Sequence, residues 1–213
     1  RMPNWLGDVV MSLPHLRALR QARPDAEITL LCLPAFLPLL EDLAIADRLH
    51  PLPSSRKLLG ILDLLPLRRE FPDLHLLFTH SLRGDLEALL LGAPRRYGVL
   101  RPGRRRPFLT HAYSATQEDI AGHQTNLWES FLRHFGMESE LDLSPFSLPR
   151  PAEPTGASHI TTIALAPGSS NNPEKRYPPE QWLRLARLLL DARKDLRIHL
   201  LGGIAEHQIA QAI

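Results

Sequence analysis

A glycine and a carboxylate stand at the start of an amphipathic helical pattern in the segment Pro3-Asn4-Trp5-Leu6-Gly7-Asp8. Gly7 lacks the Cβ that would hinder close approach of a ligand, and the free N–H groups of a first helical turn attract anions. Asp8 is the one side chain of the segment that can act as a Brønsted base near neutral pH. Aspartate also caps helices well, so the segment alone favours a structural cap over a catalytic base.

A second polar segment follows an apolar run far along the chain and reads Pro167-Gly168-Ser169-Ser170-Asn171-Asn172-Pro173-Glu174-Lys175-Arg176. Hydroxyls and backbone N–H groups at the carboxyl end of a strand are where α/β sheets bind phosphorylated ligands. Lys175 can neutralise a phosphate as a point charge. A turn with solvated cations explains the same pattern equally well.

Arginines cluster between residues 95 and 106, although the chain as a whole has a net charge of only +2. The cluster comprises Arg95, Arg96, Arg101, Arg104, Arg105 and Arg106. A local patch of this kind suits phosphates or an anionic surface, whereas the balanced total charge gives no indication of nucleic acid binding. A solvated basic loop is the alternative.

Cys32 is the only cysteine of the 213 residues, so no disulfide forms within the chain and a reducing, cytoplasmic compartment is expected. No apolar run approaches the length needed to cross a bilayer. The ten histidines are scattered, and no closely spaced His, Asp or Cys ligands suggest a metal site. We therefore expect neither a metal nor a cofactor.

Short apolar runs alternate with helical patterns, which predicts α/β architecture with a parallel sheet covered on both faces. Strands are expected at 27–33, 74–79 and 96–100, and helices at 8–21, 36–43, 57–69, 82–91 and 117–135. Pro14 is expected to kink the first helix or to mark a late start, and Pro66 to interrupt the third.

The composition changes between residues 141 and 158, where four prolines lie among Ser, Thr and Gly, as is typical of linkers. The α/β pattern then restarts, with strands at 160–166 and 196–201 and a helix at 179–192. This predicts a first domain over 1–140, a linker over 141–158 and the beginning of a second domain over 159–213. A strand should precede Gly7, so we expect the sequence to be a piece of a longer protein at both ends.

Taken together, these segments resemble the heptosyltransferases of glycosyltransferase family 9, in particular their heptosyltransferase II group. The resemblance begins with Pro3 to Pro14 and continues through Asp73 to Arg83 and Leu91 to Gly98. It ends with Ala166-Pro167-Gly168 and Lys175-Arg176-Tyr177-Pro178. It covers nearly the whole chain in the expected order.

The resemblance implies a GT-B architecture of two Rossmann-like domains, with the acceptor on the first and the nucleotide-sugar on the second. It implies transfer of heptose from ADP-heptose to the inner core of lipopolysaccharide (Kdo-lipid A), with inversion and without a metal. It makes Asp8 the general base and Gly7, Gly168, Ser169, Ser170 and Lys175 the donor-binding residues. Such an acceptor also implies peripheral contact with the inner membrane.

An anionic glycolipid acceptor would give the basic residues a purpose. The residues expected to bind its carboxylates or phosphates are Arg56, Lys57, Ser81, Arg83, Arg104 and Arg105. The Asp-Ser-Gly-Pro-type segment that the family carries in its second domain is absent from this sequence. Two alternatives therefore stay open, which are a family 9 transferase with another donor or acceptor and a non-catalytic chain that binds the acceptor or a partner.

Overall fold

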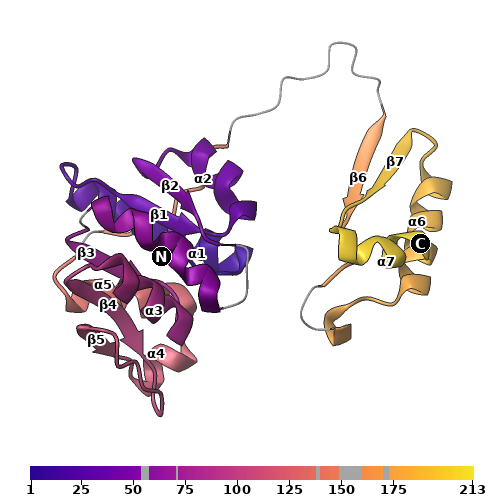
Figure 1. Cartoon of the computed structure of the whole chain (residues 1–213). Helices are drawn as coiled ribbons and strands as arrows, with labels where there is room; N and C mark the ends of the chain where they lie inside the picture. Colours follow the sequence, from indigo (N-terminus) through magenta and orange to yellow (C-terminus); the bar gives the residue numbers. More distant parts are fainter. Residues whose placement is uncertain (54–57, 71, 138–139, 149–159, 170–172) are drawn as a thin grey trace. The chain divides into compact units, whose positions relative to one another are not determined.

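The apolar runs form short parallel strands in two units, Arg1–Pro149 and Arg150–Ile213 (Figure 1). The computed structural model describes residues 1–53, 58–70, 72–137, 140–148, 160–169 and 173–213. Arg56, Lys57 and Ser170, three of the predicted binding residues, lie outside the described ranges.

In its described residues, the first unit contains five strands, all paired in parallel. These are β1 (Thr29–Cys32), β2 (Arg48–Pro51), β3 (Leu74–Leu77), β4 (Arg95–Leu100) and β5 (His111–Ser114). β1 pairs with β2, and β3, β4 and β5 form a second group in that order. The strands β2 and β5 are not among those predicted, because their sequences Arg-Leu-His-Pro and His-Ala-Tyr-Ser carry no apolar run.

Arg1 and Met2 bridge the two groups of strands. The Met2 N–H donates to the Leu31 carbonyl at 2.8 Å, and the Phe78 N–H donates to the Arg1 carbonyl at 3.2 Å. The backbone nitrogen of Arg1 also donates to the Leu76 carbonyl at 2.8 Å. Two residues therefore pair in parallel with β1 on one side and β3 on the other, and the chain then leaves at the carboxyl edge of the strands.

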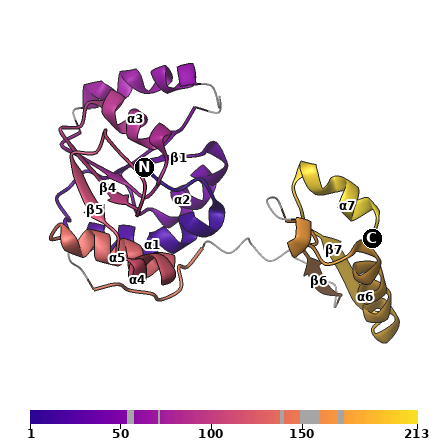
Figure 2. The ribbon, with the colours of Figure 1, turned by 90° about the horizontal axis from the view of Figure 1, so that it is seen from below.

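The helices of the first unit are α1 (Leu6–Ala22), α2 (Leu37–Leu43), α3 (Leu82–Leu91), α4 (Gln117–Ala121) and α5 (Gln124–His134), together with the 3-10 segments η1 (Pro34–Phe36) and η2 (Leu58–Glu70). Figure 2 shows α3 on one face of the strands and α1, α4 and α5 on the other. Consecutive residues of β1 point to opposite faces of the strands. Leu30 packs into the larger of two apolar clusters, and Leu31 packs into the smaller one. Both faces are covered, as the sequence predicts.

Three predicted helices differ from the observed ones. α1 begins at Leu6 and runs through Pro14, so Pro14 does not mark a late start and Gly7 and Asp8 lie inside the first turn. The described part of the segment predicted as a helix at 57–69 is 3-10 throughout. The single helix predicted at 117–135 is two helices, because Gly122 is extended (φ −79°, ψ −174°) and His123 caps α5.

The beginning of the segment predicted as a linker lies against α1. The Arg17 guanidinium donates to the Asp142 carboxylate at 2.5 Å and to the Ser144 hydroxyl at 3.0 Å. The same guanidinium carbon lies 3.8 Å from the centroid of the Phe146 ring, a cation–π contact. Residues 142–146 are therefore attached to the first unit.

The second unit contains the parallel strands β6 (Thr161–Leu165) and β7 (Leu196–Leu200). Its helices are η3 (Pro173–Lys175), α6 (Pro179–Ala192), η4 (Ile204–Glu206) and α7 (His207–Gln211). α6 has the predicted bounds, because prolines stand at its start and apolar residues recur along it with helical spacing. The polar segment after β6 leads into η3 and then α6.

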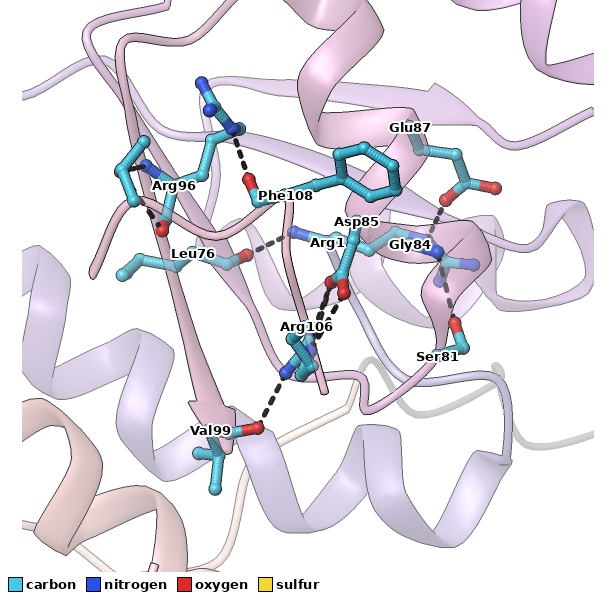
Figure 3. A network of polar contacts seen from close by, with 11 residues as sticks. Arg1, Leu76, Ser81, Gly84, Asp85, Glu87, Arg96, Val99, Arg106 and Phe108 are labelled. Atoms are coloured by element: carbon cyan, nitrogen blue, oxygen red, sulfur yellow. Dashed lines mark hydrogen bonds and ion pairs between the residues drawn. The ribbon is translucent and has the colours of Figure 1, made fainter. Parts of the chain in front are cut away.

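Two carboxylates of α3, Asp85 and Glu87, are buried almost completely and each is paired with an arginine from another element (Figure 3). Arg106 donates from Nε to the two Asp85 oxygens at 3.1 and 3.0 Å and from Nη1 to the Val99 carbonyl at 2.8 Å. Arg1 donates from Nε to Glu87 at 2.8 Å. Arg83 donates to the other oxygen of Glu87 at 3.0 Å.

Breaking the buried ion pair of Asp85 and Arg106 should cost far more stability than breaking an exposed one. Asp85→Asn leaves the Arg106 charge buried without its counter-ion, so we expect the free energy of unfolding to fall by about 3–5 kcal/mol. The control is Glu129→Gln, which removes the partially exposed partner of the exposed Arg133 and should cost less than about 1 kcal/mol. Urea unfolding measures both, and equal losses would contradict the structural role of Asp85.

Candidate functional site

Asp8 lies in the first turn of α1, at the carboxyl edge of the strands. Trp5 is the residue that precedes the helix, and no side chain caps its N-terminus. The interpretation of Asp8 as a helix cap is therefore wrong. The Asp8 side chain is half-buried, and within the described ranges no group donates a hydrogen bond to it or forms an ion pair with it. An unpaired carboxylate at this edge is available to a ligand.

The two glycines at the N-termini of α1 and α3 have opposite surroundings. A Cβ added to Gly7 would have no heavy atom within 4 Å, so nothing in the described structure requires a glycine there. A Cβ added to Gly84 would lie 2.6 Å from the buried Thr79 hydroxyl oxygen, so close packing explains that glycine. Because glycine lowers helix stability, Gly7 is better explained by access of a ligand.

Ser81 and Arg83, predicted to bind an acceptor, lie at the start of α3. The Ser81 hydroxyl accepts a hydrogen bond from the Gly84 N–H at 3.1 Å and so caps the helix (Figure 3). Arg83 is half-buried and pairs with Glu87. Both residues border the carboxyl edge of β3, and both also have a structural role that the sequence did not indicate.

The basic cluster divides into exposed and structural arginines. Arg104 and Arg105 are exposed in the loop after β4. Arg106 is buried against Asp85, and Arg96 donates to the carbonyls of Phe108 and Ala93 at 2.7 and 2.6 Å. Only part of the cluster is thus free to contact an anionic ligand. The sequence does contain one indication that an arginine of the cluster is buried. Asp85 stands among the leucines of α3, and a buried carboxylate needs a cationic partner.

His80 is a polar residue at the same edge that sequence reasoning missed. It follows β3, and although it reaches the surface, its ring is partly desolvated beside Arg101 and Arg106. Desolvation and these two positive charges lower the pKa of His80 to about 4. The imidazole is therefore neutral at neutral pH and can either donate or accept a hydrogen bond. Its place directly before Ser81 is the only sequence signal for it.

In the second unit, the loop after β6 is arranged around Arg176 and Glu206. Arg176 donates from Nε and Nη2 to the Ser169 carbonyl at 3.1 and 2.8 Å. The Glu206 carboxylate accepts from the Gly203 N–H at 2.8 Å, and a Cβ added to Gly168 would lie 2.0 Å from its other oxygen. Gly168 therefore leaves the space that the Glu206 carboxylate occupies. Lys175 is exposed at the end of η3.

The predicted residues thus form two groups, which the structure describes separately. Asp8, Gly7, Ser81, Arg83, Arg104 and Arg105 belong to the first unit, and Gly168, Ser169 and Lys175 belong to the second. The described residues contain no group of three or more His, Cys, Asp or Glu that could hold a metal ion. None of the helices in these ranges has the length and hydropathy needed to span a membrane.

A cavity of about 740 Å³ opens at the opposite, amino-terminal edge of the strands. It is lined mainly by the segments that lead into β1 and β3, together with Arg1, Tyr97 and Phe135. It contains none of the predicted site residues. The unpaired carboxylate and the exposed basic loop instead lie at the carboxyl edge, where parallel α/β sheets bind their ligands.

The α/β fold with its parallel strands matches that of the GT-B-type heptosyltransferases, and the predicted fold class is confirmed. The E. coli ADP-heptose LPS heptosyltransferase II superposes with a TM-score of 0.71 at 22% identity, covering 99% of this chain and 65% of that one. A glycosyl transferase family 9 protein from Veillonella parvula superposes with a TM-score of 0.73 at 21% identity, covering 97% and 63%.

The sequence comparison points to a particular relative. The chain is 25% identical over 237 residues to lipopolysaccharide heptosyltransferase 2 of Escherichia coli (strain K12), which covers 99% of this chain. The chain spans 64% of the length of that relative. No protein-family model matches the sequence. The resemblance to heptosyltransferases that the motifs indicated is therefore confirmed along the whole chain.

Gly7 should be replaceable without loss of stability. We expect Gly7→Ala to leave the free energy of unfolding unchanged or to raise it by up to about 1 kcal/mol, because alanine is the better helix former and has open space. The control is Gly84→Ala, which should lower it by about 1–3 kcal/mol through the collision with Thr79. Urea unfolding distinguishes them. Destabilisation by Gly7→Ala would show that the glycine is structural.

Proposed function

We propose that the protein is a heptosyltransferase that transfers heptose from ADP-heptose to the inner core of lipopolysaccharide, with Asp8 as the general base. The half-buried, unpaired Asp8 carboxylate carries the proposal. It lies at the edge of the sheet where α/β proteins bind ligands, in a motif shared with family 9 transferases. The similarity to lipopolysaccharide heptosyltransferase 2 supports the choice of donor and acceptor.

In this mechanism Asp8 accepts the proton of an acceptor hydroxyl as its oxygen attacks the anomeric carbon of the heptose. The bond from that carbon to the diphosphate oxygen breaks, and ADP leaves with the bonding electrons. Attack opposite the leaving group inverts the anomeric configuration. The open space at Gly7 lets the acceptor approach the first turn of α1, where the free backbone N–H groups favour the anionic groups of a ligand.

The second unit holds the leaving group in this proposal. Lys175 is an exposed cation after the strand β6 and before the N-terminus of α6, where positive charge stabilises a diphosphate. The Ser169 backbone is held by Arg176, which donates two hydrogen bonds to its carbonyl. Cations and helix dipoles stabilise the departing charge in this scheme, which does not call for a metal.

The acceptor lies on the first unit, at the side of Arg83, Arg104 and Arg105. The exposed guanidinium groups of Arg104 and Arg105 suit the carboxylates and phosphates of an inner-core glycolipid, whereas the half-buried Arg83 is paired with Glu87. Arg106 does not contact the acceptor, because it is occupied by Asp85. The same cations favour peripheral association with an anionic membrane surface, which we propose for the protein at the cytoplasmic face of the inner membrane.

Replacing Asp8 tests the assignment of the base. We expect Asp8→Asn to lower kcat by about 10²–10⁴-fold, because the amide cannot accept the proton, while ADP-heptose affinity stays near that of the unmodified protein. Asp25→Asn, at an exposed carboxylate of the same unit, is the matched control and should leave both unchanged. Near-normal turnover in Asp8→Asn would refute the role of Asp8.

The lysines of the second unit form a second matched pair. Lys175→Ala should weaken ADP binding and lower turnover together, because a phosphate loses its counter-charge. Lys194→Ala, at a lysine that is 85% exposed beside Asp191, should change neither. Calorimetric titration with ADP and initial rates with ADP-heptose give the two readouts. An unchanged ADP affinity in Lys175→Ala would remove Lys175 from the donor site.

A further inference from the structure

Trp5 exposes a large aromatic surface that the fold does not use. Its side chain is 55% exposed, although the other two tryptophans are buried or half-buried. Within the described ranges its ring stacks on no other aromatic ring. It precedes α1 at a position where Ser, Thr, Asp or Asn would cap the helix, and its side chain provides no cap. Neither packing nor local helix stability explains a tryptophan here.

The turn that carries Trp5 is nevertheless held firmly. The Arg1 guanidinium donates to the Asn4 side-chain oxygen at 2.9 Å and, from Nε, to the buried Glu87 carboxylate at 2.8 Å. It also donates to the Met2 carbonyl. The Arg1 side chain is only 3% exposed. A buried ion pair therefore fixes the backbone just before Trp5, so that the indole is presented from an ordered turn at little further cost in entropy.

Trp5 also borders the proposed base. Trp5 and Asp8 are the residues at the N-cap and the third helical position of α1, and residues three apart are neighbours on a helix surface. Between them Leu6 is 55% exposed, and Gly7 leaves open space. An aromatic face, an open backbone and an unpaired carboxylate thus meet at one end of α1.

We propose that the indole of Trp5 is a stacking platform for a pyranose ring of the acceptor saccharide, beside the hydroxyl that Asp8 deprotonates. The inference rests on the proposed function and adds a positioning residue to it. The electron-rich face of an indole attracts the polarised C–H groups on the apolar face of a sugar ring, and burying both surfaces is favourable. The ring's hydroxyl edge then stays free to reach Asp8.

The experiment measures binding separately from turnover. The probe is an inner-core saccharide that contains Kdo and has been freed of its acyl chains. Because Trp5 is the most exposed tryptophan, we expect the saccharide to protect tryptophan fluorescence from acrylamide in the unmodified protein and in Asp8→Asn. We expect Trp5→Ala to lose that protection and to raise the acceptor KM by about tenfold, with the KM for ADP-heptose unchanged. Trp5→Phe should restore most of the affinity.

Two controls make the result decisive. Leu62→Ala removes exposed apolar surface from η2 and should leave the acceptor KM unchanged. Circular dichroism checks that each variant is folded.

Protection by ADP alone would show that Trp5 is covered by donor binding and would overturn the inference. A Trp5→Ala defect that appears only with acylated acceptor in vesicles would assign the indole to lipid and overturn it too. Normal turnover in Asp8→Asn would refute the base while the protection by saccharide still stands.

Discussion

Two carboxylates buried on one helix organise the first unit. Asp85 and Glu87 have no access to solvent, so each must be neutralised by an arginine within the fold. Arg106 reaches Asp85 from the loop after β4, and Arg1 reaches Glu87 from the segment between β1 and β3. α3 thereby fixes the two chain segments that carry the exposed arginines and Asp8.

The division of labour among the charged residues follows from this constraint. Arg1 and Arg106 form buried ion pairs within the fold. Arg104 and Arg105 instead extend into solvent from a loop that Arg106 anchors at its end. Asp8 remains unpaired, although arginines are plentiful in the chain. A carboxylate that the protein leaves without a counter-ion, beside a glycine that the helix does not require, is an arrangement that favours ligand binding over stability.

Elements with strong apolar periodicity were predictable from the sequence, and those defined by pairing were not. α3 and α6 have the predicted bounds because leucines recur along them at helical spacing. β2 and β5 could not be predicted, since their short polar sequences become strands only by pairing with β1 and β4. The end of α4 at Gly122 was not predictable either, because the His123 side chain caps the start of α5 and so stabilises two helices in place of one continuous helix.

The site was predictable where a motif is local and unpredictable where it depends on burial. Gly7 and Asp8 stand out in the sequence as a glycine and a carboxylate directly before an amphipathic pattern, but only the fold shows that Asp8 is not the cap. The arginine cluster was visible as composition, yet its separation into Arg106 and the exposed Arg104 and Arg105 required the position of Asp85. Trp5 gave no indication of its exposure.

The contact between Gly168 and Glu206 has an evolutionary consequence. The two residues lie in different turns of the second unit, and no side chain larger than hydrogen fits at 168 while the glutamate keeps its place. A larger residue at 168 therefore requires the flexible end of the Glu206 side chain to turn away from the Gly203 N–H that it accepts from. A glutamate at 206 is thus tied to glycine at 168 only as long as it also holds the turn after β7, whereas a shorter residue at 206 leaves position 168 unrestricted.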